Sequence, residues 1–121
     1  MNIKILKSKI HRAVITEACL DYEGSISIDV KLMEKAGIIN HEKVHVLNLT
    51  NGNRLETYVI PSQKKGSICI NGAAAHLMHP GEMIIIVAYA QMNIEIAKKY
   101  TPTVVCVDEN NQIKNINGKE D

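Results

Sequence analysis

The chain has 121 residues, 45% of them hydrophobic, which suits a single domain with a substantial core. The sequence has no Phe or Trp and only four Tyr, so aliphatic and often β-branched residues, which favour sheets, must fill that core. A formal net charge of +1 and the lack of stacking aromatics argue against a nucleic-acid partner.

The cysteines and the apolar runs narrow the class of protein further. Cys19, Cys69 and Cys106 are odd in number and widely spaced, so they do not indicate a disulfide framework, and the histidines lack metal-ligand spacing. We therefore expect no metal. The start of the chain has no signal-peptide pattern, and the longest apolar run, residues 83–90, is too short for a bilayer. We expect a cytoplasmic protein with no membrane partner.

Alternating apolar and polar residues predict short strands along most of the chain. Turn residues separate them: Asn51-Gly52 is typical of a type I′ hairpin and Pro80-Gly81 of a turn. The most apolar run, residues 82–91, is expected to cross the core. The expected strands cover residues 2–10, a segment centred on 13–16, and residues 26–28, 44–49, 54–60, 67–70, 82–91 and 103–107.

Two short helices are predicted between the strands. Asp29 is suited to cap a helix over residues 31–36 that Gly37 would end, and Asn93 to cap another through residue 99. Residues 71–76 predict a loop running into a helical turn, and residues 115–121 a frayed polar tail. Short strands with regular turns and few helices favour a mainly β fold, a small closed barrel formed by one domain over residues 1–121.

The Gly24-Ser25 dipeptide between two apolar runs has two interpretations. The commoner is a turn, since Gly and Ser are usual turn residues. The alternative is self-cleavage, because Gly24 allows strained backbone angles that bring Ser25 Oγ to the preceding carbonyl. Attack would give an ester, elimination would give dehydroalanine, and hydrolysis with loss of ammonia would leave a pyruvoyl group.

Several residues could serve a pyruvoyl enzyme, although each has an ordinary structural interpretation. Arg54 could clamp a carboxylate, or it could be a solvated hairpin residue. Lys9 and His11 share one face of a strand, which could simply be a wet face. Tyr58 lies on the same side as Arg54 and could donate a proton, or its hydroxyl could be half-buried. Thr57 points to the other side of a regular strand, so its contribution would need a bulge or a neighbouring subunit.

The segment Asn71-Gly72-Ala73-Ala74 could offer backbone N–H groups to an anion, because its small side chains allow close approach. A plain connection between a strand and a helix explains it equally well.

Taken together, these motifs resemble the aspartate 1-decarboxylase family, a group of pyruvoyl-dependent lyases that make β-alanine for pantothenate biosynthesis. The resemblance follows the chain in order and extends to Gln91. The segments that carry it are 9–12 (KIHR), 22–29 (YEGSISID), 36–38 (AGI), 48–54 (NLTNGNR), 57–58 (TY) and 71–76 (NGAAAH).

The resemblance implies a six-stranded double-psi β-barrel with two or three short helices, assembled as a homotetramer with active sites between subunits. It implies a zymogen cleaved between Gly24 and Ser25 into chains 1–24 and 25–121. Ser25 would become the pyruvoyl group that forms the Schiff base, and neither metal nor pyridoxal phosphate is implied. Whether a helper protein assists maturation stays open.

The resemblance also assigns the remaining residues. Tyr58 matches the proton donor, and Thr57 matches a residue that assists cleavage and contacts substrate. By the same match, Lys9 and Arg54 face the carboxylates of L-aspartate, Gly72, Ala73 and Ala74 contact substrate, and His11, Tyr22 and Asn71 line the pocket. The rival function from another class is an unprocessed, non-catalytic barrel that binds a small anion or a partner protein.

Overall fold

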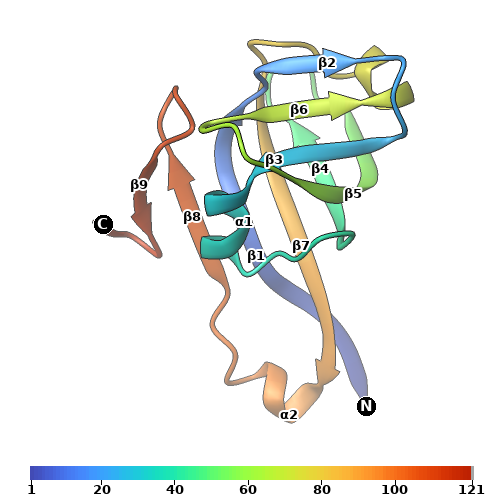
Figure 1. The fold of residues 1–121 in the computed structure, drawn as a ribbon. Helices are drawn as coiled ribbons and strands as arrows, with labels where there is room; N and C mark the ends of the chain where they lie inside the picture. Colours follow the sequence, from blue (N-terminus) through green and yellow to red (C-terminus); the bar gives the residue numbers. More distant parts are fainter. Residues whose placement is uncertain (121) are drawn as a thin grey trace.

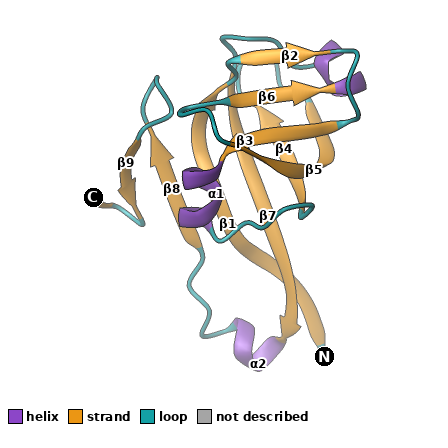
Figure 2. Ribbon diagram, in the orientation of Figure 1, coloured by secondary structure: helices purple, strands orange, loops and turns teal. Residues whose placement is uncertain are grey.

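A computed structural model describes residues 1–120, and the fold is mainly β with short helices (Figures 1 and 2). The strands follow the hydrogen-bonded order β10-β9-β8-β1-β7-β4-β5-β3-β6-β2. Their bounds are β1 (Asn2–Val14), β2 (Glu17–Cys19), β3 (Ser25–Asp29), β4 (Lys43–Asn48), β5 (Arg54–Ser62), β6 (Ile68–Asn71), β7 (Met83–Asn93), β8 (Thr103–Val107), β9 (Ile113–Ile116) and β10 (Lys119–Glu120). The helices are α1 (Val30–Ala36), α2 (Ile94–Ala97) and the 3-10 helix η1 (Gly72–His76).

The core is made of aliphatic side chains from the inner faces of the strands, as the composition predicts. Ile10 on β1 pairs with Ile86 on β7, which also pairs with Val46 on β4, and all three side chains are fully buried. Because side chains alternate across a strand, the neighbouring residues Lys9 and His45 lie on the outer face.

The first helix begins and ends where the sequence predicts. Asp29 caps α1 by accepting the Lys31 N–H at 2.9 Å, and its other carboxylate oxygen accepts the Gly66 N–H at 2.8 Å. Gly37 ends the helix in the left-handed conformation, with φ of 70°. Asn93 likewise caps α2 through the Glu95 N–H, but this helix ends at Ala97 rather than at residue 99.

The two strands expected near the N-terminus are largely one strand, so that prediction is wrong. β1 continues from Asn2 to Val14, with a register shift against β7 between Ile10 and Ala13. Arg12 takes a φ of 66° within this shift, which is the signature of a bulge that bends the strand without ending it. β5 also runs further than expected, through Pro61 to Ser62.

The predicted type I′ hairpin at Asn51-Gly52 is wrong. That turn needs positive φ at both central residues, and of the two only Gly52 has it, at 80°. The connection between β4 and β5 is a longer loop, in which Asn48 Oδ1 accepts the N–H groups of Thr50 and Asn51. A side chain that binds nearby backbone groups in this way replaces the tight hairpin.

The frayed tail expected at residues 115–121 is wrong for its described part, and Asp121 lies outside the described residues. β9 pairs with β8, and β10 returns on β9 through a turn at Asn117 and Gly118, whose φ angles are 55° and 77°. Ile113 and Ile116 pack against the core, so burial of apolar area holds this segment in place.

The predicted mainly β class with few short helices is therefore confirmed, while closure as a six-stranded barrel stays a prediction. Over residues 1–120, the helices are all too short or too polar to cross a bilayer.

Candidate active site

The Gly24-Ser25 junction lies where an exposed loop enters the sheet. Ser25 is the first residue of β3 and is only 1% exposed, whereas Gly24 is exposed. The Ser25 hydroxyl donates to the carbonyl of Glu23 at 3.2 Å, and Asn71 Nδ2 donates to Ser25 Oγ at 3.0 Å. The serine is thus held on both sides next to the bond that its hydroxyl would attack.

The backbone of Gly72 lies directly against the Gly24-Ser25 junction. Its φ is 73°, and a Cβ at this position would lie 2.8 Å from both Gly24 N and Gly24 Cα and 2.9 Å from the Tyr22 carbonyl oxygen. Real Cβ atoms do not approach backbone so closely, so only glycine fits here. The two glycines bring the end of β6 into backbone contact with the loop before Ser25.

Thr57 shares a groove with Gly24. β5 runs parallel to β3 with Ile26 beside Val59, which brings Thr57 level with the junction. The groove has a volume of about 310 Å³ and is lined by Gly24, Leu55, Glu56, Thr57, Ala73, Ala74 and Leu77. We call Gly24, Ser25, Thr57, Asn71, Gly72, Ala73 and Ala74 the junction cluster, since the structure brings these predicted site residues together.

A second group of predicted residues lies on the outer face of the strands β5, β4, β7 and β1. Lys9 pairs with Val87, Val87 with His45, and His45 with Glu56, so one row of side chains crosses four strands. Two residues on from Glu56 in either direction, Arg54 and Tyr58 share its side of β5. We call Lys9, Lys43, His45, Arg54, Glu56 and Tyr58 the outer face.

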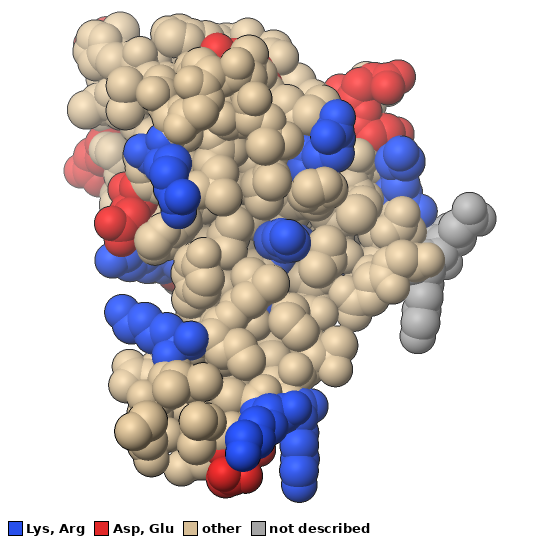
Figure 3. All heavy atoms as spheres, turned by 180° about the vertical axis from the view of Figure 1, so that it is seen from behind, with Lys and Arg blue, Asp and Glu red and all other residues tan. Residues whose placement is uncertain are grey.

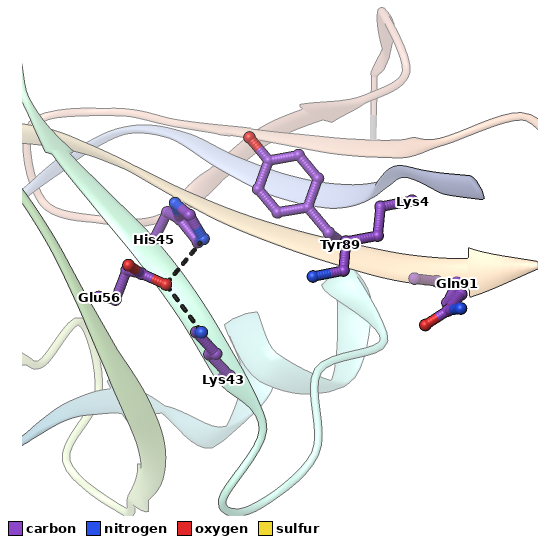
Figure 4. Close-up of a pocket in the computed structure, with 7 residues that line it drawn as sticks. Lys4, Lys43, His45, Glu56, Tyr89 and Gln91 are labelled. Carbon is purple, nitrogen blue, oxygen red and sulfur yellow. Dashed lines mark ion pairs between the residues drawn. The ribbon is translucent and has the colours of Figure 1, made fainter.

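Charges on the outer face are partly paired. Glu56 Oε1 lies 2.8 Å from Lys43 Nζ and 3.4 Å from His45 Nε2 (Figure 4). The hydrogen bond from Lys43 is the main reason that the pKa of Glu56 is lowered, and the charges of Lys43 and His45 add to it. Seen from behind, the basic side chains stand in separate groups rather than in one continuous patch (Figure 3).

Two hollows open on the outer face. Arg54 lines one of about 290 Å³ together with His45, Leu55 and Glu56. The other, of about 520 Å³, is lined by Lys4, Lys43, His45, Glu56, Tyr89, Ala90 and Gln91 (Figure 4). The rings of His45 and Tyr89 meet edge to face at 5.1 Å, so the hollow has an aromatic wall beside its charged rim.

Thr57 and Tyr58 lie on opposite sides of β5, as strand alternation predicts. Thr57 shares the inward side with fully buried Val59, whereas Tyr58 packs edge to face on His41 at 5.9 Å. The junction cluster and the outer face adjoin at β5, because Leu55 and Glu56 line both the groove with Gly24 and the hollow with Arg54. The parallel register that sets Ile26 beside Val59 also brings Tyr58 level with Ser25. We call the two groups half-sites.

His11 and Tyr22 complete the predicted set. His11 is half-buried on β1, and its Nδ1 has no hydrogen-bond partner among residues 1–120. Burial lowers the pKa of His11, and the charges of Lys9 and Arg12 lower it further. Tyr22 is 56% exposed, and its backbone carbonyl is the part that faces Gly72.

The sequence-based prediction missed two residues that touch the junction cluster. Ser27 Oγ accepts a second hydrogen bond from Asn71 Nδ2 at 3.0 Å, and the Cys69 thiol donates to Asn71 Oδ1 at 3.2 Å. Ser27 follows Ser25 by two residues, and Cys69 precedes Asn71 by two. This spacing puts each pair on one strand face and was the signal available in the sequence.

Comparison with known proteins identifies the family. The sequence profile of the aspartate decarboxylase family matches residues 1–114. The chain belongs to this family. It is 54% identical over 121 residues to the aspartate 1-decarboxylase of Clostridium beijerinckii, covering 99% of this chain and 98% of that one. It is 56% identical to those of Campylobacter jejuni and Acetivibrio thermocellus, again over 99% of this chain and over 95% and 96% of theirs.

These matches extend beyond the part of the chain on which the resemblance was based. The expectation that it ends at Gln91 is wrong, because the family profile continues through β8 and into β9. β8 pairs in parallel with β1 from Ser8 to His11, next to the outer face. The C-terminal strands therefore belong to the same framework as the predicted site residues.

Proposed function

We propose that this protein is a pyruvoyl-dependent lyase that converts L-aspartate to β-alanine and carbon dioxide, supplying β-alanine for pantothenate synthesis. Membership of the aspartate decarboxylase family supports the reaction. The observation that carries the proposal is the buried Ser25 hydroxyl, held by Asn71 beside a glycine junction that Gly72 presses from the other side.

Maturation begins with attack of Ser25 Oγ on the Gly24 carbonyl carbon. The C–O bond forms, the Gly24–Ser25 C–N bond breaks, and the hydroxyl proton passes to the freed Ser25 nitrogen. Removal of the Ser25 α-proton then expels the Gly24 carboxylate and leaves dehydroalanine. Water replaces its nitrogen, ammonia leaves, and a ketone stays at the new N-terminus. The products are chains 1–24 and 25–121.

The junction cluster fits this chemistry. Thr57 shares the groove with Gly24, where its hydroxyl is available to the Gly24 carbonyl as charge develops on oxygen. The close backbone approach of Gly72 restricts the loop that carries Gly24, so less conformational freedom has to be lost when Ser25 attacks. Once formed, the pyruvoyl group supplies an electron sink for decarboxylation and takes the place of a metal or pyridoxal phosphate.

The outer face supplies the groups that bind and protonate the substrate. Arg54 and Lys9 neutralise and orient the two carboxylates of L-aspartate, with Ala73 and Ala74 lying along the substrate. His11 and Tyr22 line the same pocket. When the bond from Cα to the α-carboxylate breaks and carbon dioxide leaves, Tyr58 returns a proton to Cα. The second carboxylate stays on the product.

The opposite directions of Thr57 and Tyr58 on β5 suggest how the enzyme is assembled. We propose that the junction cluster of one subunit meets the outer face of a neighbour in a homotetramer of double-psi barrels located in the cytoplasm. The two sides of β5 support this arrangement, because Thr57 and Tyr58 point in opposite directions and a neighbouring subunit can supply the group that one chain turns away.

The experiment is a direct assay of purified protein with L-aspartate. Wild type should form β-alanine, and Ser25→Ala should form none and should remain a single chain. Ser67→Ala, which removes another buried serine hydroxyl, is the matched control and should behave as wild type. A wild-type chain that stays intact and forms no β-alanine would favour the non-catalytic binding barrel instead.

A further inference from the structure

Two short strand segments place four polar side chains on one face next to the cleavage bond. β3 and β6 run antiparallel, with Ser25 opposite Asn71 and Ser27 opposite Cys69. Ser25 and Ser27 are two residues apart, as are Cys69 and Asn71, so all four side chains point to the same side of the ladder. The proposed function uses Ser25 and Asn71 and leaves Ser27 and Cys69 unexplained.

The Asn71 amide sits at the centre of this group with both ends engaged. Nδ2 donates to Ser25 Oγ and to Ser27 Oγ, each at 3.0 Å, and Oδ1 accepts the Cys69 thiol at 3.2 Å. An amide nitrogen carries two hydrogens, so the two serines use both. Asn71 is only 3% exposed, so little solvent is available to satisfy the amide in another orientation.

The direction of this amide matters for the attack. As Ser25 Oγ gives up its proton and approaches the Gly24 carbonyl, negative charge develops on Oγ. An N–H group pointing at Oγ stabilises that charge, whereas an amide rotated by half a turn would point its own carbonyl oxygen at it. Whatever holds Oδ1 away from Ser25 therefore keeps the nucleophile in a productive setting.

We propose that Cys69 is a positioning residue for self-cleavage, because its thiol binds Asn71 Oδ1 and so directs Nδ2 at Ser25. This inference rests on the proposed function and deepens it. The protonation state of the thiol agrees with the role. Burial raises the pKa of Cys69, with Glu17 and Cys19 adding to the rise and Lys64 opposing it. The S–H form, which is the form that donates, is therefore favoured.

The test follows the rate of chain cleavage in freshly purified precursor by denaturing gel and mass spectrometry. Cys69→Ala loses the hydrogen bond from the thiol to Asn71 Oδ1, so cleavage should slow roughly three- to tenfold. Cys69→Ser restores a donor and should cleave close to the wild-type rate. Cys106→Ala removes another half-buried cysteine and is the matched control, with no change expected.

A double-mutant cycle separates positioning from a general packing effect. If Cys69 acts through Asn71, Cys69→Ala should slow cleavage in the wild-type background and have no further effect in Asn71→Ala. Three outcomes would overturn this inference and leave the proposed function intact. The first is an equal cleavage rate for wild type and Cys69→Ala, and the second is equal slowing by Cys69→Ala and Cys69→Ser. The third is additive slowing in the double mutant. A wild-type precursor that never cleaves would overturn the proposed function together with this inference.

Discussion

Asn71 and Ser25 face each other across the first residue pair of the β3–β6 ladder, and Asn71 Nδ2 donates to Ser25 Oγ at 3.0 Å. The residue after Asn71 is Gly72, whose backbone lies against Gly24. One short segment at the end of β6 therefore holds both residues of the proposed cleavage bond. Changes in this segment should impair cleavage before they impair folding.

Gly72→Ala should abolish cleavage, because its new Cβ would overlap the backbone of Gly24 and push the loop away from Ser25. The fraction of cleaved chain on a denaturing gel is the measurement, and circular dichroism reports the fold. Gly81→Ala is the matched control: its φ of 90° is equally unusual, but a Cβ there has nothing within 4 Å. Normal cleavage of Gly72→Ala would show that the close approach has no role.

Tyr58→Phe should cleave normally but decarboxylate poorly, since the proposed cleavage uses the side chains of Ser25, Thr57 and Asn71 and not the Tyr58 hydroxyl. Loss of a general acid lowers turnover by roughly a hundredfold or more. The measurement is kcat for β-alanine formation by the fully cleaved variant. Wild-type turnover would remove Tyr58 from the proposed role.

Coexpression of differently tagged Ser25→Ala and Tyr58→Phe chains tests whether the half-sites meet between subunits. A shared site that takes Ser25 from the Tyr58→Phe chain and Tyr58 from the Ser25→Ala chain contains both groups. Mixed oligomers purified through both tags should therefore be more active than either variant alone. If both groups act within one chain, mixing restores nothing.

Asn111→Ala should strongly lower the free energy of unfolding, although Asn111 belongs to neither the junction cluster nor the outer face. Asn111 is 1% exposed, and its side chain accepts the Val14 N–H at 2.7 Å and donates to the carbonyls of Val14 and Gly66 at 2.8 Å each. Leaving these groups unpaired should cost roughly 3 kcal/mol. Denaturant unfolding measures this cost, with neighbouring Asn110→Ala as the control that should change stability little.

Glu82 should make stability depend on pH in the acid range. The backbone N–H of His79 lowers the pKa of Glu82 most, followed by the hydrogen bond from Asn48 Nδ2. The pKa is lower in the folded chain, so its contribution is complete above the ordinary carboxyl pKa and is lost as the pH falls through the folded value.

Glu82→Gln should therefore reduce the free energy of unfolding at neutral pH, and the difference from wild type should shrink on acidification. Glu34→Gln, which removes an exposed carboxylate on α1, controls for net charge and should show neither effect. A Glu82→Gln variant as stable as wild type at neutral pH would contradict the prediction.

Local patterns predicted much of the fold because each depends on neighbouring residues. Alternation located most strands, and Asp29 with Gly37 bounded α1. The errors came from long-range contacts. The bulge at Arg12 depends on how β1 pairs with β7, and the tail is ordered because Ile113 and Ile116 reach the core. The Asn-Gly pattern was assigned to residues 51–52, whereas residues 117–118 both have the positive φ that it favours.

Some residues of the candidate site could likewise be predicted from local patterns, whereas others depend on long-range pairing. Gly24 and Ser25 are recognisable from their motif, and the opposite orientation of Thr57 and Tyr58 follows from alternation. The contacts of Cys69 and Ser27 with Asn71 depend on the register between β3 and β6, which no local pattern specifies. Sequence alone therefore indicated the nucleophile but not the side chains that orient its neighbour.

Intact-mass spectrometry of freshly purified, folded protein tests self-processing most directly. We expect two species, residues 1–24 and residues 25–121, with the larger lighter by one ammonia than the same fragment carrying an unmodified serine. A single uncleaved chain, or a larger fragment that retains its serine nitrogen, would contradict the account.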